Sequence, residues 1–135
     1  AERDVRVDDW FFPCHFTADP VQPGCLGVDA IWQLIGLYLG MCGPAHSGRA
    51  LGCQQVDFFG QIRPHNLLVR YEVDIRRYTC MPEKQVSLAV GTGRVYVDGE
   101  HIYTVVDAKV GSFPEIAYTD YPLRSAQAVG GIMER

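Results

Sequence analysis

The sequence predicts a single α+β domain in which an antiparallel sheet wraps around one long buried helix. The first observation is the segment 25–42, CLGVDAIWQLIGLYLGMC, which is apolar almost throughout and rich in good helix formers. A helix that is hydrophobic all round is expected to be buried on most sides. The second observation is that most of the chain after it alternates between apolar and polar residues, as half-buried strands do. An antiparallel sheet can bury one face and leave the other in water, so it can cover such a helix.

The chain before the helix forms short and irregular elements. Residues 1–12 are expected to end a strand and then to form an aromatic cluster at Trp10, Phe11 and Phe12. Residues 13–24, PCHFTADPVQPG, contain three prolines and end in glycine, which is typical of an irregular loop.

The helical segment is nearly long enough to cross a membrane, which takes about 20 apolar residues. It contains Asp29, Gln33 and several glycines, and it is on the short side for a membrane span. We therefore expect a core helix and no membrane association.

Four long strands are expected after the helix, at residues 48–62, 67–78, 85–97 and 100–110. In the second of these, apolar residues such as Val69, Tyr71 and Val73 alternate with charged ones. The dipeptide Asp98-Gly99 predicts a two-residue hairpin, because both central positions of that turn need a positive φ.

Residues 112–135 lose the alternation, so we expect a domain at residues 1–113 followed by a tail at residues 114–135. Four strands and one helix leave a sheet edge and a helix flank uncovered. An uncovered edge and flank favour a homodimer.

Composition excludes several classes of protein. The chain of 135 residues is long enough to bury a core without disulfides or metal. The net charge is -4 and the charges are interspersed, so no basic stripe for nucleic acid is present. The five cysteines are odd in number and form no CxxC pair, which argues against a disulfide framework and a structural zinc site. Unpaired cysteines are typical of a reducing cytosol, so we expect a cytoplasmic protein.

The helix carries two polar side chains in its middle, Asp29 and Gln33, which lie four residues apart and share one face. Gly36 and Gly40 fall on roughly the same face, so this stripe is expected to line a narrow pocket. The alternative is that Asp29 only caps the helix, where the dipole stabilises a carboxylate. Two facts weaken it: Asp29 lies inside the expected helix start, and a carboxylate among apolar neighbours is costly to bury unless paired or protonated.

His15 lies in the proline-bracketed loop directly before the helix. A lone histidine is more often structural than catalytic, but Pro13, Pro20 and Pro23 restrict this loop. Gly24 follows, where backbone N–H groups at a helix start can stabilise a developing oxyanion. The other three histidines have no such surroundings.

The residues around His15 and Asp29 carry a resemblance to a known family. The run WFFPCHFTADPVQPGCLGVDAIWQLIGLYLG, from Trp10 to Gly40, resembles the active-site segment of the 3-hydroxydecanoyl-acyl carrier protein dehydratases, the bacterial FabA family. The segments GRALG, DFFGQIRP and VDGEHIYTVVDAKVGSF also resemble that family, so the resemblance extends over about residues 1–113. It implies the hot-dog fold and a dehydratase that acts on acyl chains carried by acyl carrier protein.

The resemblance also implies the catalytic pair. His15 matches the catalytic histidine of the family. Asp29 matches its catalytic aspartate, which in the family comes from the partner subunit of a dimer. Related dehydratases of the FabZ type carry Glu at this position, so Asp29 favours the FabA type.

Four further residues have matches in the family's site. Gly24 and Cys25 match the helix start, whose backbone N–H groups polarise the thioester carbonyl. Val21 matches a loop residue whose backbone contacts the histidine. Gln33 matches a residue that orients the aspartate.

The chain departs from the family pattern near the loop. Glycine is expected at the positions of Pro13 and Ala18, and an apolar residue at Gln22. We expect these changes to affect substrate choice and isomerisation more than dehydration. The family's N-terminal helix and strand are absent, and residues 114–135 run past its usual end. We therefore expect a domain taken from a larger lipid or polyketide synthase.

These residue types fit the dehydration of a 3-hydroxyacyl thioester to a trans-2-enoyl thioester. His15 is the expected base for the weakly acidic C2 proton, and the amides of the helix start are the expected donors to the thioester oxygen. Asp29 is the expected acid, because a carboxyl in an apolar pocket can stay protonated and release the hydroxyl as water. No metal or organic cofactor is needed. The same pair could isomerise a trans-2 to a cis-3 double bond.

Two other functions stay open on the residues alone. A hot-dog thioesterase would use a carboxylate to activate water and would not need His15 in such a loop. A non-catalytic hot-dog module that holds acyl chains or dimerises a synthase would need neither His15 nor Asp29.

Overall fold

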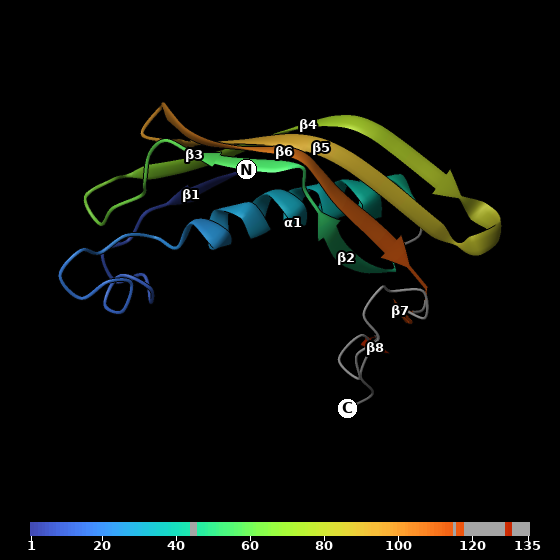
Figure 1. Ribbon diagram of the computed structural model, residues 1–135, viewed down its shortest axis with the longest axis horizontal. Coiled ribbons are helices and arrows are strands. Elements are labelled where there is room, and N and C mark those ends of the chain that lie inside the picture. Colours follow the sequence, from blue (N-terminus) through green and yellow to red (C-terminus); the bar gives the residue numbers. More distant parts are fainter. Residues whose placement is uncertain (44–45, 115, 118–128, 131–135) are drawn as a thin grey trace.

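A computed structural model of the chain describes residues 1–43, 46–114, 116–117 and 129–130. One long helix packs against a curved antiparallel sheet (Figure 1). The elements in chain order are β1 (Glu2–Asp4), α1 (Gly24–Cys42), β2 (Ser47–Gly52), β3 (Gln55–Phe58), β4 (Leu68–Met81), the 3-10 turn η1 (Pro82–Lys84), β5 (Val86–Val97), β6 (Glu100–Phe113), β7 (Ile116–Ala117) and β8 (Val129–Gly130).

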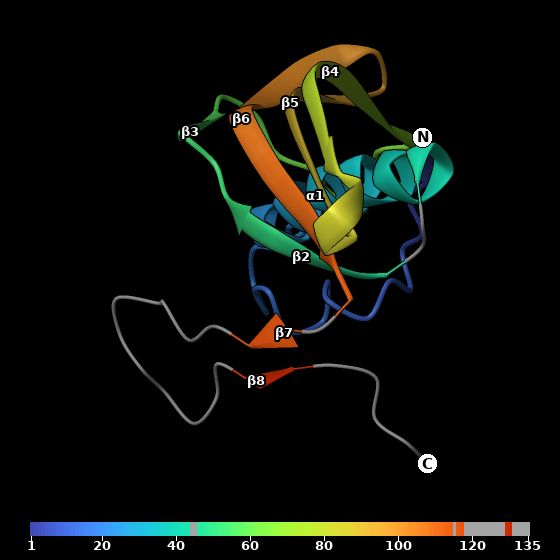
Figure 2. The ribbon, with the colours of Figure 1, turned by 90° about the vertical axis from the view of Figure 1, so that its right-hand side faces the viewer.

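The main sheet holds six strands within the described residues, in the order β1-β4-β5-β6-β2, with β3 also pairing with β6. Every pairing in it is antiparallel. The sheet curls over one side of α1, from β4 through β5 and β6 to β2 (Figure 2). This confirms the predicted α+β hot-dog fold, in which one sheet wraps one helix.

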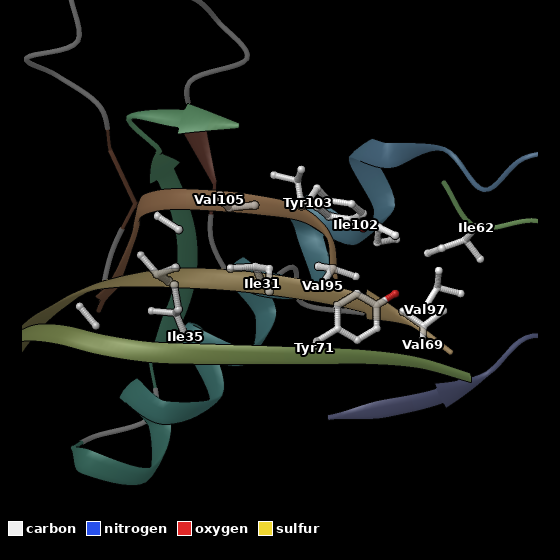
Figure 3. Close-up of a cluster of buried hydrophobic side chains, with 14 of the residues drawn as sticks. Ile31, Ile35, Ile62, Val69, Tyr71, Val95, Val97, Ile102, Tyr103 and Val105 are labelled. Carbon is white, nitrogen blue, oxygen red and sulfur yellow. The ribbon is translucent and has the colours of Figure 1, made fainter. Parts of the chain in front are cut away.

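The core forms where the inner face of α1 meets the concave face of the sheet. Ile31, Ile35 and Leu39 are at most 1% exposed. Figure 3 shows Ile31 and Ile35 pointing towards the central strands. Val95 on β5 and Val105 on β6 meet them and are also fully buried. Burying each such side chain contributes about 1.5–3 kcal/mol, so this layer supplies much of the drive for folding.

The outer face of α1 differs from the expectation of a helix buried on most sides. Leu37 is 61% exposed and Met41 is 79% exposed, and Asp29 and Gln33 are exposed as well. The sheet reaches only one side of the helix, so the described residues of a single chain leave the other apolar side without cover. By length and composition α1 would also pass as a membrane span, a test that the core helix of a soluble protein passes equally.

The predicted single strand at residues 48–62 is wrong. The chain forms two strands there, β2 and β3, and both pair with β6. The break falls at Gly52, which has a φ of 136°, next to a register shift between Ala50 and Gly52. The irregularity bends the chain, so that it follows β6 as the sheet curls.

The other predicted elements are close to those observed. The helix begins at Gly24, one residue early, and β4 and β6 extend about three residues further than predicted. Asp98 and Gly99 have φ values of 51° and 88°, which confirms the hairpin.

The predicted loss of strand character at residue 112 is wrong, because β6 continues to Phe113. The expected tail at residues 114–135 lies mostly outside the described residues. Within it, β7 and β8 pair antiparallel, with Ile116 opposite Gly130.

Candidate active site

The loop before α1 holds His15 through backbone hydrogen bonds. The His15 amide donates to the Phe11 carbonyl at 2.8 Å, and the Val21 amide donates to the His15 carbonyl at 2.8 Å. Phe16 and Asp19 exchange two backbone hydrogen bonds of 3.0 Å, which close the turn between them. The three prolines reduce the freedom of the same segment, so the imidazole starts from a well-defined backbone.

The imidazole of His15 is oriented by the backbone of Val21. Its Nδ1 lies 2.9 Å from the Val21 carbonyl oxygen. A carbonyl oxygen only accepts hydrogen bonds, so Nδ1 carries a proton and donates it. In the neutral ring Nε2 then keeps its lone pair, which is the form that a general base requires.

His15 borders a cavity of about 240 Å³ at the start of α1. Its walls come from the loop, the helix start and strands β3 and β6, with the residues His15, Val21, Gln22, Gly24, Phe58, Gly60, Gln61, Ile62 and Tyr103. The structure therefore brings together three of the six predicted site residues, His15, Val21 and Gly24.

The start of α1 has free donors and no side-chain cap. Pro23 is the capping residue and makes no side-chain hydrogen bond to the helix. The first N–H groups of a helix lack partners in a preceding turn, so the Gly24 amide next to the cavity can donate to a ligand. The capping interpretation of Asp29 is excluded, because this residue lies in the second turn of the helix.

Asp29 lies on the other side of the helix. The Gln33 amide nitrogen donates to the Asp29 carboxylate at 3.4 Å, a long hydrogen bond that joins the two predicted partners. Both line a hollow of about 400 Å³ together with Gly36 and Gly40, as the polar-and-glycine stripe predicted. Its opposite wall includes residues from β2 and β6, among them Arg49.

Within one chain the described residues split the predicted site in two. The cavity of His15 does not include Asp29, and neither hollow that Asp29 lines includes His15. Helix geometry explains the separation. Gly24 and Asp29 are five residues apart, which at about 100° per residue places them on different faces. Cys25 is exposed and does not line the His15 cavity, and Gln33 stays with Asp29.

Of the three residues that depart from the family pattern, one lines the His15 cavity and two lie outside it. Gln22 is 6% exposed and lines the His15 cavity. Its side-chain oxygen accepts a hydrogen bond of 2.5 Å from Arg3 of β1. Pro13 and Ala18, by contrast, are exposed and do not line the cavity.

Tyr103 is one of several cavity residues that the sequence did not reveal, and it is the one with a buried polar group. It is 2% exposed, and its ring lies 4.9 Å from that of Phe58. Burial raises the pKa of Tyr103 well above that of a free tyrosine. Nothing in the local sequence of β6 indicates this position, because Tyr103 joins the wall of the His15 cavity only through the pairing of β6 with β3 and its packing against α1.

Comparison with known families agrees with this geometry. The chain matches the FabA-like domain over residues 1–106, which include the loop, α1 and most of the sheet. The chain belongs to the FabA-like family. The match supports a dehydratase- or isomerase-type function for this FabA-like domain, on a fold that agrees with the hot-dog architecture.

Proposed function

We propose that this FabA-like domain converts 3-hydroxyacyl thioesters on acyl carrier protein into trans-2-enoyl thioesters. The observation that carries the proposal is the Val21-oriented imidazole of His15, which shares a cavity with the free amide of Gly24. A base and an oxyanion donor on one cavity are the two groups that removal of a C2 proton from a thioester requires.

The mechanism uses three groups. Nε2 of His15 takes the C2 proton, and the electron pair of that bond forms the C2–C3 double bond. The Gly24 amide stabilises the negative charge that develops on the thioester oxygen. The carboxyl of Asp29 gives its proton to the C3 hydroxyl, which leaves as water.

We propose that each complete site forms between two chains, with His15 of one and Asp29 of the other. The separation of the two residues within one chain supports this arrangement. The outer face of α1 supports it too, because Leu37, which lines the same hollow as Asp29, is largely exposed, and so is Met41 further along the helix. Covering that face would bury apolar surface and bring the carboxyl into a drier environment.

The direct test incubates the purified chain with 3-hydroxydecanoyl-acyl carrier protein and follows the carrier-bound product by intact mass. We expect loss of one water with the thioester intact. Release of the free acid would show a thioesterase instead, and an unchanged bound thioester would show a non-catalytic module.

We propose isomerisation of the trans-2 to the cis-3 enoyl thioester as a second activity of this site. His15 would remove a proton from C4 and a proton would return to C2. Asp29, which matches the FabA type, supports it. The step needs C4 held near the imidazole. Gas chromatography of products made from trans-2-decenoyl thioester tests it, and a dehydratase that gives no cis-3 product would lack the second activity.

A further inference from the structure

The hydroxyl of Tyr103 is buried without a hydrogen-bond partner among the described residues. A buried polar group left unpaired costs about 1–3 kcal/mol, because it loses its bonds to water. Such groups are rare in folded proteins and call for an explanation. The side chain as a whole is more than nine-tenths buried, at 2% exposure.

The position of this hydroxyl is tightly defined. A β-carbon at Gly27 would overlap it, so the oxygen lies directly against the first turns of α1. Figure 3 shows Tyr103 at the N-terminal end of the helix, where the core meets the loop region. The same residue lines the cavity that contains His15 and the start of α1 at Gly24.

The phenol is held as a hydrogen-bond donor. Burial, and then the neighbouring Tyr71, raise the pKa of Tyr103, while Arg3 acts in the opposite direction. A free tyrosine is already protonated at neutral pH, and the raised pKa moves the ionisation of Tyr103 further from neutrality. A protonated phenol in a dry site can donate a strong hydrogen bond to a developing negative charge.

We propose that the Tyr103 hydroxyl donates a hydrogen bond to the thioester carbonyl oxygen of the bound substrate, beside the Gly24 amide. This inference rests on the proposed dehydratase function and adds a catalytic residue from β6. As His15 removes the C2 proton, charge moves onto that oxygen, and the O–H of Tyr103 stabilises it without giving up its proton. The bound carbonyl would also supply the partner that the buried hydroxyl lacks.

The test compares Tyr103→Phe with the wild-type protein. We expect kcat for 3-hydroxydecanoyl thioester to fall about a hundredfold, as for the loss of one oxyanion donor. Thermal stability should stay unchanged or rise, because the substitution removes an unpaired buried group. A purely structural tyrosine would give the opposite pattern, with lower stability and unchanged kcat.

The matched control is Tyr96→Phe, which removes the hydroxyl of a half-buried tyrosine on β5 outside the cavity and should keep wild-type kcat. A second readout is the infrared carbonyl frequency of bound trans-2-decenoyl thioester labelled with ¹³C at C1. The frequency should lie closer to that of the free thioester in Tyr103→Phe than in the wild type. 3-Fluorotyrosine at position 103 alone, a better donor in nearly the same volume, should shift it further from the free value.

The outcomes separate the two proposals. An active wild type with an inactive His15→Ala variant, and with Tyr103→Phe within threefold of wild type, would overturn the role of Tyr103 alone. A carbonyl frequency that ignores both changes at position 103 would do the same. A folded wild type that makes no enoyl product would overturn the dehydratase function and this inference with it.

Discussion

His15, Val21 and Gly24 lie close together in sequence, and their contacts depend on local backbone geometry. The residues themselves therefore indicated the imidazole and the amide beside it, and the resemblance to the FabA family implied the backbone contact from Val21. Tyr103 lies far along the chain and meets them only through strand pairing. Its hydroxyl has no sequence signature, because its environment comes from packing against Gly27.

Replacing His15 by alanine should lower kcat/KM for dehydration at least about a hundredfold, as expected when a general base is lost. Steady-state assay of the enoyl product measures the change. His65→Ala is the control, because His65 lies outside the cavity and its loss should leave the rate unchanged. Near-normal turnover by a folded His15→Ala protein would remove His15 from the mechanism.

At the scale of elements, α1 and strands β4 to β6 follow directly from periodicity and from the Asp98-Gly99 turn. The split between β2 and β3 was missed, although residues 48–62 contain Gly52, where the strand breaks, and the adjacent like residues Gln54-Gln55 and Phe58-Phe59. The expected burial of α1 on most sides was also wrong. Apolar composition indicates that a helix face will be covered, but it does not say whether the same chain covers it.

Substitution by alanine should change the stability of the protein in opposite directions at two glycines of α1, because Gly27 packs against β6 and Gly40 does not. Gly27→Ala should destabilise the protein by about 1–3 kcal/mol, because the new methyl group overlaps the Tyr103 hydroxyl. A β-carbon at Gly40 would meet no atom of the described residues within 4 Å, so Gly40→Ala should stabilise the protein by up to about 1 kcal/mol. Urea unfolding gives both values, and equal effects would contradict the close packing at Gly27.

The Asp98 turn predicts a specific response to acid. Hydrogen bonds from the Leu68 amide, the Asn66 side chain and the Leu67 amide lower the pKa of Asp98. Its contribution to stability is therefore present above the unfolded value of about 3.9 and is lost as the pH falls through the lower folded value.

Asp98→Asn should reduce the drop in urea midpoint between pH 7 and pH 3, because an amide does not titrate in this range. Glu83→Gln, at an exposed position of η1, is the control and should keep the wild-type drop. If the two variants respond alike, the carboxylate of Asp98 does not anchor the start of β4.

At the scale of the whole molecule, the proposed dimer combines His15 of one chain with Asp29 of the other in each site. A mixture of His15→Ala with Asp29→Asn, each inactive alone, should regain activity after subunit exchange. One site of each mixed dimer then contains both intact residues, so up to about half of the wild-type activity per mixed dimer is expected.

Enoyl product formation, with native mass spectrometry to count mixed dimers, measures the recovery. Each variant mixed with wild-type protein under the same exchange conditions provides the reference. Confirmed mixed dimers that stay inactive would favour sites built within one chain.

The location of Asp29 on the outer face of α1, away from the His15 cavity, has an evolutionary consequence in the proposed dimer. Two duplicated copies of such a gene can diverge so that one copy loses the histidine and the other loses the aspartate. Their heterodimer keeps one complete site, while its second site is free to accumulate changes. A copy that lacks one catalytic residue is then an obligate partner, and its sequence alone would misleadingly suggest an inactive protein.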